Sequence, residues 1–445
     1  MSRSPRLRRG DLLPRLRASR SGSAPRATIR RGSAAETPGL APPLADDALL
    51  WSEARGANVL DADGNRYIDL TAGFGVAAVG HRHPAVVAAI KHQAGRLIHG
   101  LGDAQGHPLR LELAARLRRL APIDDARVAF AVSGSDAVEL AVKTALLATG
   151  RPRVLAFEPA YHGLTLGALT LSSRPSFRRV AGRHLHRQVR RLPFGGEIDE
   201  IAATLADEAF AAAIVEPIVG REGVLVPPSD WLAALAAACK RHGTLLIVDE
   251  IFTGFGRTGR WFAVGHEGVE PDLLCCGKAL GGGMPLAAVL GRAEVMAAWA
   301  APGEARHTAT FVAQPLACAA ALASLDTLRS ERLIARAARL GRRLHRTLAE
   351  WPSLTPALVE VRGRGALWGL EFSSAEAAAG FADAARRRGI LLLAGGAAGR
   401  VAQLVPPLTI SDHQLEHALE TLADILAANG AAGEAPGKAP GKALE

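Results

Sequence analysis

The sequence predicts an α/β protein in which helices cover a mostly parallel sheet and a smaller α+β domain adjoins it. Apolar segments of strand length alternate with helical segments between residues 128 and 290, which is the order of a β-α-β fold. The run "LLIV" at 245–248 is apolar without interruption, as expected for a strand buried on both faces of a sheet. The chain has 445 residues, more than the roughly 250–300 at which a single core stops growing, so a second domain is expected.

The first 45 residues are predicted to form a basic, disordered arm. Residues 1–35 carry ten arginines and one acid, Asp11, so they contribute nine units of the net charge of +10. Such an arm could be an RNA-binding tail, a transit peptide or a solvated extension. It has no aromatic side chain on which a base could stack, so we favour a plain extension and expect no nucleic-acid partner.

Residues 46–84 are predicted to begin the small domain with a β-hairpin. The turn tripeptide Asp63-Gly64-Asn65 separates two short apolar segments, which is the signature of a hairpin. Apolar residues at helical spacing follow, and the first of these helices starts at His83-Pro84. The elements expected in this region are strands at 58–62 and 66–70 and helices over 84–96 and 109–120.

The large domain is predicted over residues 85–325. Its strands are separated by helical segments, and parallel strands need such long crossover connections. In chain order we expect strands at 128–132, 153–157, 211–216, 245–249, 273–276 and 286–290, with helices over 135–149 and 229–242.

Residues 326–430 are predicted to complete the small domain, and residues 431–445 to form a disordered tail. A long helical region begins at Pro315 and continues to about Trp351. The tail repeats the sequence APGK twice, which is a low-complexity pattern. The remaining expected elements are strands within 361–372 and 401–410 and helices over 375–388 and 413–428.

The composition excludes several classes of protein. No apolar run reaches the ~18 residues that a membrane span needs. Four cysteines in so long a chain cannot form a disulfide framework, and their usage fits a reducing compartment, so we expect a cytoplasmic protein. His81-Arg82-His83 lacks the acidic partners of a metal motif, so no metal site is expected.

Three polar features lie where apolar strands end. Ser133-Gly134-Ser135 joins a strand to a helix, and its N–H groups could hold a phosphate, although an ordinary serine cap is equally plausible. Asp249 ends the "LLIV" strand, where α/β enzymes place ligand contacts. Lys278 lies between an apolar strand and a glycine run, where burial would lower its pKa. Together they are what pyridoxal phosphate requires, namely a lysine that bonds it, an acid for its ring nitrogen and a phosphate site.

The sequence resembles the class III, or ω-amino-acid, aminotransferases that depend on pyridoxal phosphate, such as acetylornithine and 4-aminobutyrate aminotransferases. The resemblance runs from about Leu50 to Ala428. It implies fold type I, with a seven-stranded sheet in the large domain, and ping-pong transfer of an amino group from an amine, ω-amino acid or diamino acid to 2-oxoglutarate or pyruvate. The motifs that carry it are "GNRYIDLTAGFGVAAVGHRHP", "SGSDAVELAVKTA", "YHGLTLGALTLS", "EPIVGREG", "LLIVDEIFTGFGRTG", "PDLLCCGKALGGGMPLAAVLG", "HTATFVAQPLACAAALA" and "LVPPLTI".

The resemblance also implies roles for individual residues. Lys278 matches the lysine that bonds the cofactor and moves a proton, and Asp249 matches the acid beside the ring nitrogen. The turn at 133–135 matches the phosphate site, and Tyr161 matches the aromatic ring stacked on the cofactor. Thr310 matches a threonine that reaches the phosphate of the neighbouring subunit, which implies a homodimer.

Several positions around the expected substrate are less typical. Glu216 matches a glutamate near substrate and cofactor, and His162 follows the stacked ring with a role left open. Leu164 replaces an arginine that can bind a distal carboxylate, and Phe252 replaces a glutamine that contacts the cofactor. Gln403 stands where many members have an arginine for substrate carboxylates.

These departures suggest a hypothesis about the substrate. If Glu216 has lost its usual arginine partner, a second amine or a hydroxyl of the donor could pair with it, since an unpaired buried carboxylate is costly. Another arginine would then bind the keto acid, and Arg362, Arg364 and Arg400 are candidates that the sequence does not rank.

Other interpretations of the chain stay open from sequence. The family also contains decarboxylases, aminomutases and racemases with the same cofactor residues. A non-catalytic binding protein on this fold is a further alternative.

Overall fold

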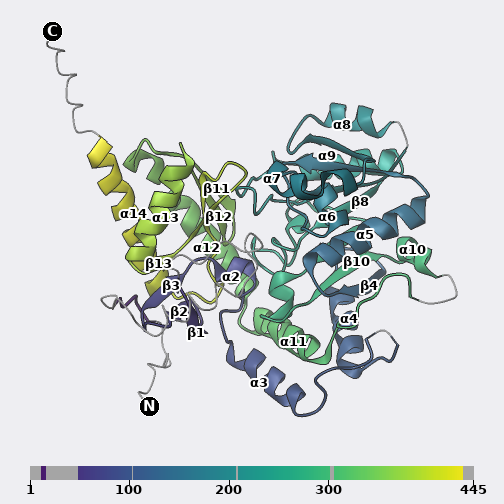
Figure 1. Cartoon of the computed structure of the whole chain (residues 1–445), viewed down its shortest axis with the longest axis horizontal. Coiled ribbons are helices and arrows are strands. Elements are labelled where there is room, and N and C mark those ends of the chain that lie inside the picture. The colour runs from purple at the N-terminus through teal and green to yellow at the C-terminus, as the bar shows by residue number, and fades with distance from the viewer. Residues whose placement is uncertain (1–11, 17–48, 103, 207–208, 301–304, 434–445) are drawn as a thin grey trace, which may run out of the picture.

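The structure is a computed structural model that describes residues 12–16, 49–102, 104–206, 209–300 and 305–433. Figure 1 shows two parts, a larger one around the helix α5 (Gly134–Thr149) and a smaller one that carries α13 (Ala375–Arg387) and α14 (Asp412–Gly433). Among the described helices, none is long and apolar enough to cross a membrane.

The larger part is built on a seven-stranded mixed sheet, in the order β4-β10-β9-β8-β7-β5-β6. Only β10 runs antiparallel to its neighbours, β4 and β9, and the other pairs are parallel. This confirms the predicted mostly parallel sheet. The strands are β4 (Ala126–Ala131), β5 (Arg153–Glu158), β6 (Val189–Pro193), β7 (Phe210–Val215), β8 (Leu245–Asp249), β9 (Leu273–Cys276) and β10 (Ala287–Arg292).

Both faces of this sheet are buried, which explains its uninterrupted apolar strands. Successive side chains of a strand point to opposite faces. In β8, Ile247 packs in the cluster beneath α5, whereas Leu246 and Val248 pack in the larger core on the other face. The helices α4 (Pro108–Leu120), α9 (Trp231–Arg241) and α11 (Pro315–Ser330) contribute to that larger core.

Helix boundaries follow from local capping. α5 begins after Ser133, whose side chain accepts a hydrogen bond from Asp136 N (3.2 Å), and it ends at Gly150 in the left-handed conformation. α3 (Pro84–Ala94) starts with a proline, as expected. The long helical region predicted from Pro315 is two helices, α11 and α12 (Leu333–Leu348), because Arg332 between them has a φ of 52°.

The smaller part combines described segments from the N-terminal and C-terminal regions of the sequence. One antiparallel sheet has the order β11-β12-β15-β14, and a second has the order β1-β2-β3-β13. In the second sheet β13 runs parallel to β3, with Ile390 opposite Ile68, so a C-terminal strand completes the N-terminal hairpin. The strands are β1 (Trp51–Arg55), β2 (Asn58–Asp61), β3 (Arg66–Asp69), β11 (Leu358–Arg364), β12 (Leu367–Phe372), β13 (Ile390–Leu391), β14 (Leu393–Gly395) and β15 (Val401–Leu404).

Some elements escaped the sequence analysis. The edge strand β6, "VRRLP", is too polar to read as buried, and the strand expected over 401–410 ends at Leu404 because two prolines follow. The missed α-helices are short: α2 (Ala72–Gly75), α6 (Leu166–Leu171), α7 (Pro175–Arg178), α8 (Ile198–Leu205) and α10 (Ala293–Met296).

The N-terminal arm needs a correction at residues 12–16, which dock on the smaller part rather than extending into solvent. The Asn58 side chain accepts from Leu12 N (3.3 Å) and donates to Leu12 O (2.8 Å). Arg66 donates to Leu13 O (2.7 Å), and Arg15 forms an antiparallel bridge with it. The rest of the predicted arm lies outside the described residues. Of the predicted tail, 431–433 continue α14 and the remainder is not described.

Candidate active site

Four strands bring the predicted site residues to one edge of the large sheet. Asp249 ends β8, Glu216 directly follows β7, and Lys278 follows β9. Ser133 follows β4, which points the same way as β9 because β10 is antiparallel to both. The carboxyl ends of these strands therefore meet at one edge, which is where α/β sheets bind ligands.

Asp249 and His162 form a buried pair at this edge. His162 Nδ1 lies 2.8 Å from Asp249 Oδ2, and Ile251 N donates to Asp249 Oδ1 (3.0 Å). Burial by itself lowers the pKa of His162, but the hydrogen bond to Asp249 and the charges of Asp249 and Glu216 raise it above its ordinary value. The second ring nitrogen, Nε2, is buried without a hydrogen-bond partner among the described residues.

Lys278 points its amine at an aromatic face. Its Nζ lies 4.0 Å from the centre of the Phe252 ring. Burial lowers the pKa of Lys278 to about 8, although Asp249 and Glu216 act in the opposite direction. The position predicted from the strand and the glycine run therefore does hold an amine that ionises less readily than an exposed lysine.

Glu216 is hydrogen-bonded, which removes one premise of the substrate hypothesis. Its two carboxylate oxygens accept from Tyr161 N (2.9 Å) and from Gly220 N (3.1 Å). Burial raises the pKa of Glu216 to about 7, and Asp249 adds to the rise, whereas His162 opposes it. The hypothesis that a donor amine or hydroxyl pairs with Glu216 assumed a carboxylate without partners, whereas two backbone N–H groups bond it here. The donor contact itself stays a prediction.

The turn at 133–135 packs closely against the loop at 163–164, which lies between β5 and α6. Ser135 Oγ accepts a hydrogen bond from Leu164 N (3.1 Å). Gly163 lies so close that a Cβ there would be 1.9 Å from Ser135 Oγ, and its φ is +127°. A Cβ at Gly134 would be 2.9 Å from Ile251. The close packing therefore leaves no room for a side chain at Gly163 or at Gly134.

Aromatic rings flank the site. The rings of Tyr161 and Phe177 lie edge to face with centres 6.3 Å apart, and the guanidinium of Arg221 stacks 4.3 Å above the Tyr161 ring. A Cβ at Gly220 would lie 2.0 Å from the Phe252 ring, so the loop after β7 can approach the ring closely only with glycine there.

The structure gathers most, but not all, of the predicted residues. Lys278 and Glu216 lie with the buried Asp249–His162 pair, whereas Gln403 bonds to the loop after β7, donating to Gly220 O (3.2 Å). Leu164 is about half exposed, at 49%. Thr310 is exposed and lies beside Gly102, where a Cβ would be 3.4 Å from the Thr310 carbonyl oxygen.

Arg221 is a site residue that was not predicted from the sequence. It lies five residues after Glu216 in the motif "EPIVGREG". A charged residue so close to a predicted site glutamate was the feature of the sequence that pointed to it. Of the proposed arginines, Arg362 is paired with Glu360 and Glu371, both at 2.6 Å. Arg364 instead lines a pocket with Thr258 and His266 among other residues, and the site residues above do not line it.

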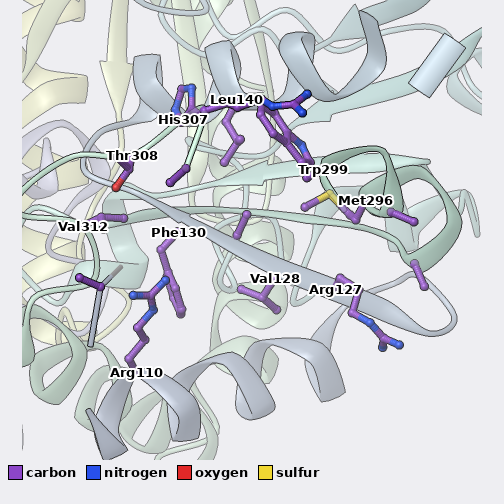
Figure 2. Close-up of a pocket in the computed structure, with 16 residues that line it drawn as sticks. Arg110, Arg127, Val128, Phe130, Leu140, Met296, Trp299, His307, Thr308 and Val312 are labelled. Carbon is purple, nitrogen blue, oxygen red and sulfur yellow. The ribbon is translucent and has the colours of Figure 1, made fainter. Parts of the chain in front are cut away.

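A separate cavity of about 1000 Å³ opens near the β4 edge of the sheet, and none of the predicted site residues lines it. Figure 2 shows Arg110, Phe130, Trp299 and His307 among the residues that line it. His307 Nε2 lies 2.9 Å from Asp136 Oδ1, which ties the 305–312 segment to the first turn of α5. The hydrogen bond between His307 and Asp136 is the main cause that lowers the pKa of Asp136.

Comparison with known proteins gives the family directly. A model of the family described as aminotransferase class-III matches residues 43–426. The chain belongs to the class-III aminotransferases. The family resemblance drawn from its motifs is therefore confirmed, and so is the predicted fold.

Named relatives cover most of this aminotransferase. It is 43% identical to an acetylornithine aminotransferase of Methanopyrus kandleri over 81% of this chain and 90% of the relative. It is 35% identical to a probable 4-aminobutyrate aminotransferase of Bacillus subtilis, covering 82% and 89% of the two chains. A crystal structure of ornithine aminotransferase from Toxoplasma gondii superposes with a TM-score of 0.83, at 32% identity, over 91% of this chain and 94% of that one.

Class-III aminotransferases use pyridoxal phosphate, and the residues of this aminotransferase fit it. A structure of the Toxoplasma enzyme has that cofactor at partial occupancy in its active site. Here the amine of Lys278 and the Asp249 carboxylate share one sheet edge with the start of α5. The unpartnered Nε2 of His162 adds a buried polar atom with spare hydrogen-bonding capacity among the residues described.

Proposed function

We propose that this aminotransferase moves the amino group of an ω-amino acid or diamino acid to 2-oxoglutarate or pyruvate by a ping-pong mechanism. The relatives are named for acetylornithine, 4-aminobutyrate and ornithine, which all carry an amino group away from the α-carbon. The observation that carries the proposal is the Lys278 amine at 4.0 Å from the Phe252 ring, at the sheet edge that also holds Asp249.

Lys278 is the proton carrier in this proposal. When bound, pyridoxal phosphate supplies a carbonyl that takes up the amino group and a ring that delocalises negative charge. Because burial lowers the pKa of Lys278 to about 8, part of its amine is neutral near that pH. Its Nζ can then take a proton from the reacting carbon of the substrate and return it.

Asp249 would keep the ring nitrogen of the bound cofactor protonated. Its carboxylate is oriented by Ile251 N on one oxygen and by the His162 ring on the other. An opposite charge at contact distance stabilises the protonated ring nitrogen, by about 1–3 pKa units in typical cases. The turn at 133–135 would hold the phosphate through its N–H groups and hydroxyls.

We further propose a homodimer in which Thr310 reaches the phosphate bound by the partner subunit. Thr310 and its neighbour Phe311 are exposed, Phe311 by 66%. The Phe311 ring lies 5.2 Å from that of His99. The sequence neighbours of His99 include two exposed apolar residues, Ile98 (60%) and Leu101 (62%). Exposed apolar residues that gather in one place mark an interaction surface.

A donor screen tests the reaction. Purified enzyme loaded with cofactor is mixed with 4-aminobutyrate, ornithine, acetylornithine or a diamine, and with 2-oxoglutarate or pyruvate, and the new amino acid is measured. We expect glutamate or alanine to form only when both substrates are present, and Lys278→Ala to form none. Turnover without a keto acid, with release of carbon dioxide or with rearranged or racemised donor, would favour the other reaction types of the family.

We also propose a cytoplasmic location and no nucleic-acid partner. All four cysteines are buried and unpaired, which suits a reducing compartment. Fluorescence microscopy of the tagged full-length chain in its own cells tests the location. Titration of the enzyme with labelled RNA tests the second point, and we expect binding that is weak and lost in moderate salt.

A further inference from the structure

Arg221 is an exposed arginine beside the site that has no anionic partner among the described residues. Its guanidinium carbon lies 4.3 Å from the centre of the Tyr161 ring and 5.4 Å from that of Phe177. Stacking on an aromatic face engages the plane of the guanidinium and leaves its N–H groups, which lie in that plane, free to donate. The residue is therefore held in place without its hydrogen-bonding capacity being used.

The loop that carries Arg221 is anchored on both sides. Gly220 N donates to the Glu216 carboxylate (3.1 Å), and Gln403 Nε2 donates to Gly220 O (3.2 Å) and to Arg221 O (3.4 Å). Val219 and Leu225 form an antiparallel bridge across the base of the loop. The backbone is thus fixed, and the Arg221 side chain projects from a rigid support.

The positive charge of Arg221 acts on the reacting amine. Arg221 is one of the groups that lower the pKa of Lys278, after the larger effect of burial. The geometry agrees, because Arg221 directly follows Gly220, where a Cβ would be 2.0 Å from the Phe252 ring. The same ring lies 4.0 Å from Lys278 Nζ.

Neighbouring arginines are already engaged. Arg174 donates to Glu222 (2.8 Å) and to Gly396 O (2.9 Å), and Arg257 is buried and donates to backbone carbonyl oxygens. Arg362 is held by two carboxylates, and Arg400 lies 3.4 Å from Glu371.

We propose that Arg221 binds a carboxylate of the substrates, including that of the keto acid. Gln403 stands at the position that the family resemblance gives to a carboxylate-binding arginine, but its side chain is neutral. Its amide nitrogen donates to Gly220 O and Arg221 O in the loop that carries Arg221. Arg221 supplies a cation from the loop that Gln403 contacts, and a guanidinium can bind a carboxylate through two parallel hydrogen bonds. The inference rests on the proposed function, because it names Arg221 as the residue that binds the keto acid of that reaction.

Binding of glutarate tests this without requiring turnover. Glutarate has the two carboxylates of 2-oxoglutarate and no keto group, and its dissociation constant is measured by calorimetry on the cofactor-loaded enzyme. We expect Arg221→Met to weaken binding by about 10- to 100-fold, the usual worth of a charged hydrogen-bonded pair, and Arg221→Lys to weaken it less. Arg387→Met is the matched control, because Arg387 is an exposed arginine on α13 of the smaller part, and the variant should bind glutarate as the parent does.

Two results would overturn the proposal: a parent that does not bind glutarate, or an Arg221→Met variant that binds it with the parental constant. The kinetic counterpart is KM for 2-oxoglutarate, which should rise in Arg221→Met, whereas the KM of a monoamine donor without a carboxylate stays within about twofold. If the parent transfers no amino group to any keto acid, the proposed function fails, but the glutarate measurement still decides the role of Arg221.

Discussion

Burial moves the two central ionisable side chains of the site toward their neutral forms. The pKa of Lys278 falls to about 8 and that of Glu216 rises to about 7, and in each case burial is the largest cause. Near pH 8 the amine is therefore available as a nucleophile and proton acceptor, which an exposed lysine with a pKa near 10.4 is not.

Cofactor uptake by the cofactor-free enzyme should depend on pH. Only the neutral amine of Lys278 can bond the cofactor, so the rate should rise with pH and level off above about 8 rather than above 10. The visible absorbance band, followed after mixing with pyridoxal phosphate at a series of pH values, measures this rate. A midpoint near 10 would mean that burial does not lower the pKa of Lys278 in solution.

Asp249→Asn should fold and bind cofactor but lose turnover by about 100-fold or more, because an amide does not hold a proton at the ring nitrogen. The adjacent Glu250→Gln is the matched control. Glu250 is also fully buried, but it accepts from Val264 N (2.8 Å) and Thr253 and serves the loop that follows β8. Steady-state kcat of both variants decides the point, and equal losses would show that Asp249 acts only in packing.

At the scale of elements, the loop between β5 and α6 presses on the first turn of α5. Gly163→Ala should weaken cofactor binding by about tenfold or more, since a Cβ would lie 1.9 Å from Ser135 Oγ and the φ of +127° disfavours any side chain. Gly182→Ala is the control, because a Cβ there meets nothing within 4 Å. The cofactor dissociation constant, from titration of the visible band, should change only in the first variant.

The sequence predicts these elements unevenly, for physical reasons. Strands buried on both faces, such as β8, are continuous apolar runs, and Lys278 and Asp249 are identifiable because each is polar where such a run ends. The edge strand β6 and the short helices near it carry no such pattern. Arg221 was missed because its role depends on which other arginines find carboxylate partners, and that is decided by contacts between residues far apart in the chain.

At the scale of the whole molecule, Phe311→Glu should convert the proposed dimer to a monomer and weaken cofactor binding, because it places a charge in an exposed apolar patch beside Thr310. Val180→Glu is the matched control, since Val180 is 90% exposed and has no role in the proposal. Sedimentation velocity reports the mass of each. A monomeric parent, or a Phe311→Glu variant that remains dimeric, would contradict the proposed interface.

Two truncations should differ in stability. Removing residues 1–11 should leave the thermal midpoint within about 1 °C, whereas removing residues 1–16 should lower it by several degrees. The longer deletion removes the hydrogen bonds of Leu12 with Asn58 and Gln414 and that of Leu13 with Arg66. Equal midpoints would show that the docked segment adds no stability.

The pairing of β13 with β3 has a consequence for how the protein is made. The edge of β3 that β13 covers is left open while the chain emerges from the ribosome, because β13 lies more than 300 residues later in the sequence. Until Ile390 is synthesised, the N-terminal hairpin presents unpaired backbone groups of the kind that promote aggregation. The large domain can fold first, and closure of the smaller part then depends on completion of nearly the whole polypeptide.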